Sequence, residues 1–302
     1  MPTVLMAMGT TSPVSPDAAA AVIIPHYNDV ARLERCLRAL MENDRAGVEI
    51  IVVDNGSTQS LEAVRQAFPD IRFIVEPEKG AAAARNRGVA ETRAPLLFFI
   101  DADCVAAPDW LETARRVAPM ADLIGGRVDI FDETPPPRSG AEGFEAVFAF
   151  NFRNYIEVQG FTGAGNLVTR RDVFEDVGGF RGGVSEDLDW SKRAVAMGYR
   201  LIYRDDLVVS HPSRSDWAAL RHKWRRMTQE LFATSGTDAR ARLRWGLRAL
   251  AMPASALVHM PRVLFSPQLD GAGERWCAAL TLVRLRLLRM AWMLQQAAGR
   301  SI

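Results

Sequence analysis

Cysteine is scarce in this 302-residue chain. Its three cysteines, Cys36, Cys104 and Cys277, lie far apart, which excludes a cysteine-based zinc module. So few cysteines are typical of a protein kept in a reducing compartment, and none of the three requires a role.

The chain also lacks a long apolar run. The best candidate, residues 249–261, is interrupted by Pro253 and His259 and is shorter than the roughly 18 residues that a membrane-spanning helix needs. Residues 1–19 are rich in Pro, Ser, Thr and Ala and have no basic segment followed by an apolar core. They predict a flexible leader rather than a secretory signal.

Two nucleotide-binding signatures are missing as well. No G-x-G-x-x-G follows the first predicted strand, and no G-x-x-x-x-G-K-[ST] occurs. Dinucleotide dehydrogenases and P-loop NTPases are therefore disfavoured.

Charge of one sign is not in excess overall, since 37 basic residues face 36 acidic ones. The balance hides an asymmetry: residues 240–302 hold ten arginines and two acids, a net charge of +8, which leaves −7 on residues 1–239. Arginines interleaved with Leu, Met and Trp favour helices that lie on an anionic membrane surface. A helical hairpin that closes the fold or forms a dimer is the structural alternative. Nucleic acid is disfavoured because these arginines do not form a purely polar face.

The most informative stretch present is residues 96–103, an apolar run that ends at Asp101 and Asp103. Bounded by Pro95, it predicts a strand buried on both faces of a parallel sheet. Two carboxylates just past such a strand can share a hard divalent cation with the phosphates of a substrate. Taken alone, the two acids could equally begin a turn before Pro108.

Alternating strand and helix patterns surround this run. Asp29 is expected to cap the first helix. Strands are predicted at 20–24, 48–53 and 71–75, and helices at 30–40, 61–68 and 81–88. Together with the strand at 96–100, they predict a doubly wound, mostly parallel α/β sheet.

Polar groups at the ends of these strands should converge at one edge of the sheet. Tyr27 offers a ring for a base, Asp54 can accept the imide hydrogen of a base, and Asp101 with Asp103 lie where ribose, metal and diphosphate would be. Arg85 could meet the charge of the diphosphate, or it could be an ordinary solvated arginine on a helix.

Seven segments, in order, resemble the successive motifs of family-2 glycosyltransferases with the GT-A fold. They are VIIPHYN at 22–28, IVVDNGS at 51–57, ARNRG at 84–88, DAD at 101–103, GAGNLVTRR at 163–171, VGGF at 177–180 and SEDLDW at 185–190. The resemblance implies a nucleotide-diphospho-sugar transferase fold, a nucleotide-sugar donor, a divalent metal (Mg²⁺ or Mn²⁺) and inversion at the anomeric carbon. It does not identify the sugar.

The resemblance also implies a role for each matching residue. Donor contacts fall on Pro25, Tyr27, Asp54, Arg85 and Asp101; metal ligands on Asp101, Asp103 and His211; acceptor contacts on Gly165, Asn166 and Trp190; and catalysis on Glu186 and Asp187. Inversion needs a carboxylate that takes the proton of the acceptor hydroxyl, and in this family that role belongs to Asp187. From the residues alone, Glu186 or Asp189 could exchange roles with it, and acids also suit the first turn of a helix capped by Ser185.

The second half of the chain carries fewer signals. Pro135, Pro136 and Pro137 predict a surface connection over residues 128–143, followed by a helix over 142–156. Residues 199–203 and 207–210 predict a short pair of strands, and 217–227 a basic helix.

The sequence therefore predicts a cytoplasmic, metal-dependent inverting glycosyltransferase, peripheral on the inner face of the membrane, for a carbohydrate or lipid-linked acceptor in polysaccharide or glycolipid synthesis. The alternatives are a nucleotidyltransferase on the same sheet and a catalytically silent nucleotide-sugar-binding or membrane scaffold protein. The predicted division is a leader at 1–19, a GT-A domain at 20–215 and a basic helical C-terminal region at 216–302. The oligomeric state is not predicted.

Overall fold

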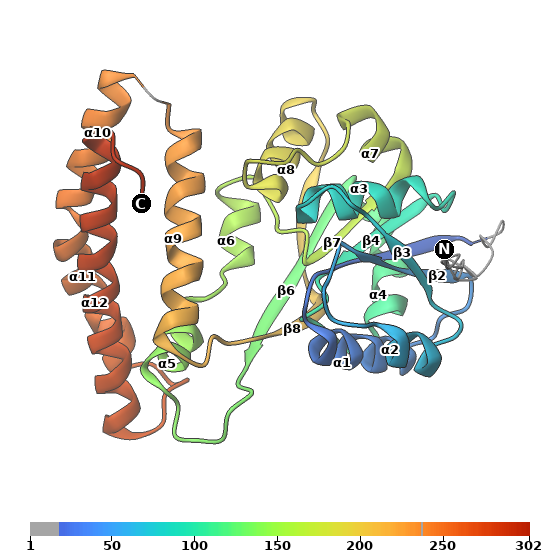
Figure 1. The fold of residues 1–302 in the computed structure, drawn as a ribbon, viewed down its shortest axis with the longest axis horizontal. Coiled ribbons are helices and arrows are strands. Elements are labelled where there is room, and N and C mark those ends of the chain that lie inside the picture. The colour runs from blue at the N-terminus through green and yellow to red at the C-terminus, as the bar shows by residue number, and fades with distance from the viewer. Residues whose placement is uncertain (1–17, 237) are drawn as a thin grey trace, which may run out of the picture. The chain divides into compact units, whose positions relative to one another are not determined.

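The computed structural model describes residues 18–236 and 238–302, which fall into two compact units (Figure 1). Unit 1 comprises residues 18–127, 152–182 and 186–209, and unit 2 comprises the remaining described residues. The predicted leader lies almost wholly outside the described residues. Unit 2 differs from the predicted C-terminal region because residues 128–151 group with the C-terminal helices.

Eight strands form one sheet in the order β3-β2-β1-β4-β7-β6-β8-β5. Strands β1 to β4 are parallel neighbours, and β7 runs antiparallel to both β4 and β6. This arrangement confirms the predicted α/β, mostly parallel sheet. The strands are β1 (Ala20–His26), β2 (Val48–Asp54), β3 (Arg72–Val75), β4 (Leu96–Ile100), β5 (Val105–Ala106), β6 (Leu123–Phe131), β7 (Asn166–Arg170) and β8 (Leu201–Pro212).

Helices cover both faces of the sheet in unit 1, because successive strand residues point to opposite sides. Phe98 packs edge-on against Trp110, whereas Phe99 packs against Phe174 and Phe180, and all five side chains are buried. In Figure 1, α1, α2 and α4 lie on one side of the sheet and α3, α7 and α8 on the other. The helices of unit 1 are α1 (Val30–Met41), α2 (Glu62–Ala67), α3 (Ala81–Ala90), α4 (Trp110–Val117), α6 (Phe152–Glu157), α7 (Arg171–Val177) and α8 (Glu186–Ala196).

The predicted cap of α1 is confirmed, since the Asp29 carboxylate accepts a hydrogen bond from the backbone N–H of Arg32. Three other predictions about secondary structure are wrong. The connection predicted from residue 128 is strand β6 as far as Phe131, and the predicted pair of strands is one continuous strand, β8. The helix predicted over 142–156 is two helices, α5 and α6.

Unit 2 is a helical bundle with its own apolar core. Its core includes Phe144 of α5, Leu220 of α9, Val263 of α11 and Leu282 of α12, all buried. Its helices are α5 (Gly140–Phe148), α9 (Trp217–Thr234), α10 (Ala239–Leu250), α11 (Met252–Leu264) and α12 (Gly271–Ala297). Among the described residues, no helix combines the length and apolar content that crossing a membrane requires.

Candidate active site

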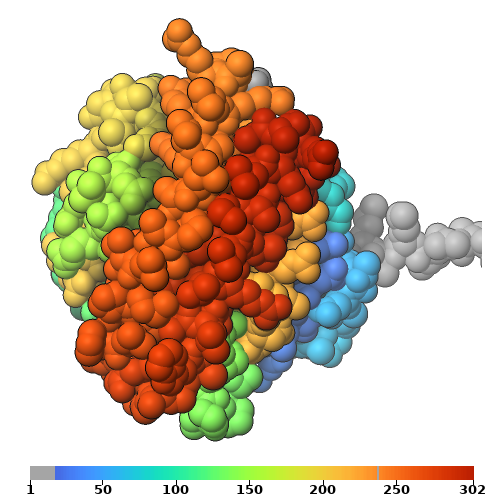
Figure 2. Space-filling model, turned by 90° about the vertical axis from the view of Figure 1, so that its left-hand side faces the viewer, coloured from blue at the N-terminus to red at the C-terminus, as the bar shows by residue number. Residues whose placement is uncertain are grey.

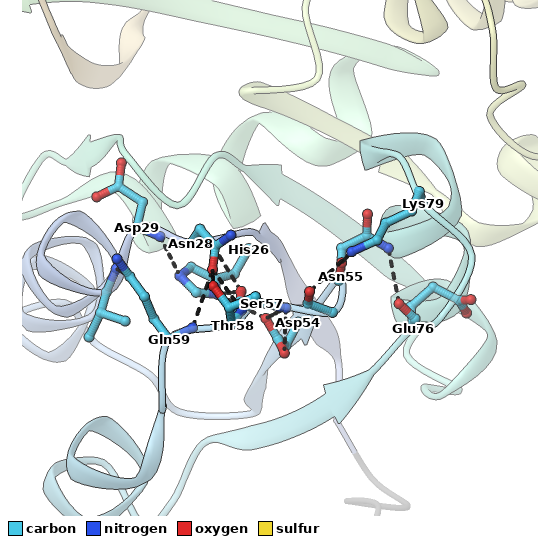
Figure 3. A network of polar contacts seen from close by, with 12 residues as sticks. His26, Asn28, Asp29, Asp54, Asn55, Ser57, Thr58, Gln59, Glu76 and Lys79 are labelled. Carbon is cyan, nitrogen blue, oxygen red and sulfur yellow. Dashed lines mark hydrogen bonds and ion pairs between the residues drawn. The ribbon is translucent and has the colours of Figure 1, made fainter.

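The carboxyl ends of β1 and β2 are joined by a buried histidine (Figure 3). His26 and Asp54 are register partners on these strands, and His26 Nδ1 lies 3.2 Å from Asp54 Oδ1. His26 Nε2 accepts the backbone N–H of Asp29 at 3.2 Å, so Nδ1 carries the ring proton and donates it to Asp54. His26 is not among the predicted site residues, although it stands one residue before Tyr27 and ends the same strand.

Asp54 is further held by the turn that follows it. The backbone N–H of Ser57 lies 3.3 Å from both carboxylate oxygens, and Ser57 Oγ accepts the backbone N–H of Asn28 at 2.8 Å. Asn28 has φ 51°, a left-handed conformation that asparagine tolerates, and its Oδ1 accepts the N–H of Thr58. These contacts fix the Asp54 carboxylate at the sheet edge, where it keeps capacity to accept a further hydrogen bond.

Asn55 ties this turn to the start of α3. Its Oδ1 accepts the backbone N–H of Gly80 at 2.7 Å, and its Nδ2 donates to the backbone carbonyl of Glu76 at 3.0 Å. Lys79, next to Gly80, donates to the carbonyl of Asn55 and places its ammonium 4.7 Å from the centre of the Tyr27 ring. Tyr27 is 56% exposed, so one face of an aromatic ring remains open to solvent beside a fixed cation.

Arg85 joins two predicted site residues that are 85 positions apart in the chain. Its guanidinium, buried on α3, donates to Asp101 Oδ1 at 2.6 Å and to Glu186 Oε1 at 2.8 Å. Burial lowers the pKa of Arg85, but Asp101 and Glu186 raise it by more, so its net pKa lies above the ordinary value. Arg85 therefore fixes the end of β4 against the start of α8.

Asp101, Asp103 and Cys104 can bring ligand atoms within 4.8 Å of one another. Burial raises the pKa of Cys104, and Asp103 and Asp101 raise it further. A thiol is also a soft ligand, which suits Mg²⁺ or Mn²⁺ less well than a carboxylate does. The two carboxylates remain as hard oxygen donors, which fit Mg²⁺ or Mn²⁺. The donor set thus agrees with the predicted divalent metal at Asp101 and Asp103.

Glycines of the loop before β7 lie close to these carboxylates. A Cβ on Gly165 would lie 2.6 Å from Asp101 Oδ2, and a Cβ on Gly163 would lie 3.4 Å from Asp187 Oδ2. The loop can therefore approach Asp101 this closely only because residue 165 has no side chain, whereas a Cβ on Gly163 would make an ordinary van der Waals contact with Asp187. The geometry groups the predicted acceptor residue Gly165 with the predicted metal residue Asp101.

The three acids at the start of α8 have different surroundings. Glu186 is paired with Arg85, and Asp189 with Arg193 at 2.9 Å. Asp187 Oδ1 accepts the backbone N–H of Leu188 at 2.7 Å. The assignment of the base to Asp187 stays a prediction.

Asn166 and Trp190 are wholly buried. Asn166 accepts the Trp110 indole N–H and donates to two backbone carbonyls, while Trp190 donates to the carbonyl of Gly178. These contacts give both side chains packing roles, and their contact with an acceptor stays a prediction.

His211 belongs to unit 2, and its ring is also buried. Its Nδ1 donates to the carbonyl of Pro212 at 2.6 Å, and its ring lies edge-on to Phe150. The role of His211 as a metal ligand stays a prediction.

Comparison with known proteins finds glycosyltransferases. The sequence model of the family described as Glycosyl transferase family 2 matches residues 21–178. Glycosyltransferase AglE of Haloferax volcanii is 33% identical over 218 residues, 68% of this chain and 70% of that protein. Pre-mycofactocin glycosyltransferase of Mycobacterium tuberculosis is 29% identical over 212 residues, 66% of this chain and 44% of that protein, so this chain spans less than half of that relative.

Among solved structures, mannosyltransferase PcManGT from Pyrobaculum calidifontis, in complex with GDP-Man and Mn²⁺, has a TM-score of 0.55 and 21% identity. The match covers 97% of this chain and 80% of that chain. This likeness confirms the predicted GT-A fold.

Proposed function

Because this chain belongs to glycosyl transferase family 2 and is a glycosyltransferase, we propose that it moves a sugar from a nucleotide-diphosphate donor to an acceptor hydroxyl, with inversion at the anomeric carbon. The observation that carries the proposal is the cluster of Asp101, Asp103, Arg85 and Glu186 at the carboxyl edge of the sheet. Ligands of open α/β sheets bind at this edge.

The donor is expected to bind from Tyr27 to Asp103. Asp54 accepts a hydrogen from the base, Tyr27 offers its exposed ring, and Pro25 shapes the end of β1. Asp101 and Asp103 hold a divalent metal, Mg²⁺ or Mn²⁺, which when bound neutralises charge on the departing diphosphate. The solved mannosyltransferase with GDP-Man and Mn²⁺ supports this combination of donor class and metal.

Asp187 serves as the base in this proposal. The acceptor oxygen forms a bond to the anomeric carbon while the bond from that carbon to the diphosphate oxygen breaks. The hydroxyl proton passes to the Asp187 carboxylate, and the electron pair of the broken bond leaves with the nucleoside diphosphate. Glu186 stays paired with Arg85 and holds α8 at the sheet edge.

The acceptor is proposed to be a carbohydrate or lipid-linked sugar, in polysaccharide or glycolipid synthesis, bound beside Gly165. Association with the inner face of the cell membrane is proposed for unit 2, which carries the ten arginines found after residue 239. Its helices expose large apolar side chains, among them Leu257 and Phe265, which are 73% and 83% exposed.

A thermal-shift screen tests the donor and the metal together. Nucleoside diphosphate sugars that differ in their base and in their sugar are each added with Mn²⁺, with Mg²⁺ or with chelator. A ligand of the folded state raises the melting temperature by mass action, and here one base should do so only when metal is present. A shift of equal size in chelator would remove the metal from the proposal.

A further inference from the structure

Arg289 occupies one of the buried, core-facing positions of α12. The buried positions of this helix recur every three or four residues, and Arg289 falls among them between Leu285 and Met293. Only 9% of Arg289 is exposed, and the buried positions one turn before and after it, Leu285 and Met293, are apolar. A charged side chain at such a place is costly unless a partner offsets the loss of water.

Other buried charges of unit 2 have partners of opposite sign. The buried Glu145 pairs with Lys223 and Arg214, and the buried Glu274 pairs with Arg138. The bundle therefore follows the usual rule that buried charges are paired.

Arg289 and Arg286 depart from this rule. Within the described part of the chain, no carboxylate pairs with either side chain. Arg289 instead lies 4.5 Å from the centre of the Trp224 ring on α9, and Arg286 is one helical turn away on the same helix. Burial lowers the pKa of Arg289 to about 10, with a further contribution from Arg286, and burial also lowers the pKa of Arg286.

Three buried hydrogen-bond donors on these two helices have no acceptor among the described residues: Nε of Arg286, Nε of Arg289 and the indole Nε1 of Trp224. Two positive charges and three free donors call for a ligand that is anionic and rich in acceptor oxygens. A phosphate group has both properties, and arginine binds it readily.

The surface of the same helices indicates that the phosphate belongs to a lipid. Figure 2 shows α10, α11 and α12 in orange and red on the face toward the viewer. Along α12, Trp276, Leu280 and Leu287 are 62%, 67% and 46% exposed, and Leu287 directly follows Arg286. Exposed leucines also recur along α10, at positions 243, 247 and 250. An inorganic phosphate has no apolar surface to bury against these side chains, whereas the acyl or isoprenoid chains of a lipid do.

We infer that unit 2 binds the phosphate group of an anionic lipid, with Arg286, Arg289 and the Trp224 N–H as its ligands. The inference deepens the membrane association proposed above. It does not depend on sugar transfer, so its failure would leave the proposed reaction untouched.

The test uses the full chain without donor or acceptor. The probes are a short-chain phosphatidic acid below its micelle concentration, inorganic phosphate, and vesicles of phosphatidylcholine with or without phosphatidic acid. The variants are Arg289→Met, which keeps the apolar stem, and the double variant Arg286→Gln with Arg289→Met. Arg248→Met, an exposed arginine of α10, is the control for the loss of one charge.

Short-chain phosphatidic acid should raise the melting temperature of the wild type and of Arg248→Met but not of the double variant. Affinity of the double variant for phosphatidic acid vesicles should fall at least tenfold relative to Arg248→Met. Without ligand, Arg289→Met should melt no lower than the wild type, because an unpaired buried charge is replaced by an apolar side chain.

Three outcomes would overturn the inference. An equal shift with inorganic phosphate would show that the site does not select a lipid. Equal binding by the double variant and Arg248→Met would show only general attraction of charge. A large loss of stability in unliganded Arg289→Met would assign the arginine a purely structural role.

Discussion

Asp103 is the residue on which the proposed metal site depends most directly. Substitution by Asn keeps the shape of the side chain but removes the charge that a hard divalent cation requires. We expect Asp103→Asn to abolish transfer and metal-dependent donor binding while the melting temperature of the unliganded protein stays close to that of the wild type. Asp172→Asn, an exposed carboxylate on α7, is the matched control. Undiminished turnover in Asp103→Asn, or full activity of the wild type in excess chelator, would contradict the proposed metal dependence.

Gly165 tests the packing of the loop against the metal site. A Cβ at this position would lie 2.6 Å from Asp101 Oδ2, and Asp101 is already held by Arg85. We expect Gly165→Ala to displace the carboxylate, to cost about 1–3 kcal/mol of stability and to weaken metal-dependent donor binding. Gly182→Ala is the control, since a Cβ there has no heavy atom within 4 Å. Equal donor affinity in the two variants, measured by calorimetry, would mean that the loop yields without moving Asp101.

Some of these residues could be found from the sequence and others could not. Asp54, Asp101 and Asp103 each follow an apolar strand, so the pattern locates them at the sheet edge. The ion pair of Arg85 with Glu186 joins residues 101 positions apart, which no local pattern contains. His26 could have been noticed, because it follows the first apolar strand as Asp54 follows the second, and the ends of parallel strands meet at one edge of a sheet.

At the scale of elements, the ion pair between α5 and α9 predicts a pH dependence of stability. Burial raises the pKa of Glu145, but Lys223 and Arg214 lower it by more, so the folded-state pKa lies below the ordinary 4.5. The unfolded chain therefore binds this proton more readily than the folded one. The stabilisation is fully present above about pH 4.5 and is lost as the pH falls through the folded-state pKa.

Urea unfolding between about pH 6 and pH 3 measures this contribution. The wild type should lose stability with falling pH more steeply than the double variant Glu145→Gln with Lys223→Met, which removes both charges of the pair. Parallel curves for the two proteins would contradict the account of the ion pair.

The errors in the predicted elements have physical reasons. In β6, residues 125 and 126 are glycines, and Thr162 and Asn166 fill the space where their Cβ atoms would be. The strand therefore lacks the apolar pattern by which a strand is recognised. In β8, the charges of Asp205 and Asp206 resemble a turn in the sequence. They instead pair with arginines while the strand continues.

At the scale of the whole molecule, the sequence correctly predicted an α/β sheet followed by a basic helical region. It did not predict that α5 would belong with the C-terminal helices, because the packing of Phe144 with Leu282 joins segments that are far apart in the chain. For the same reason, truncation before Arg240 would uncover the core of α5. Substitution of exposed side chains is a cleaner test of membrane binding.

Leu280 and Leu287 are suitable for that test because they are large, exposed and outside the core of the bundle. Changing both to Gln should lower the partition into anionic vesicles by at least about tenfold, since roughly 1.5–3 kcal/mol is gained when one such side chain is fully buried. Val158→Gln, at a 75% exposed position in unit 1, is the control. Co-sedimentation that is the same for both variants and the wild type would favour packing or dimerisation for this face.

The most direct test of the central claim is the rate of sugar transfer by Asp187→Asn at saturating donor, once the thermal-shift screen has identified that donor. Asn keeps the shape of the side chain but cannot take the acceptor proton. We expect transfer to fall by about 10²–10⁴-fold with donor affinity unchanged, and to fall less in Asp189→Asn. Near-normal transfer by Asp187→Asn would contradict it, and the role of base would pass to whichever of Glu186 and Asp189 loses transfer while still binding donor.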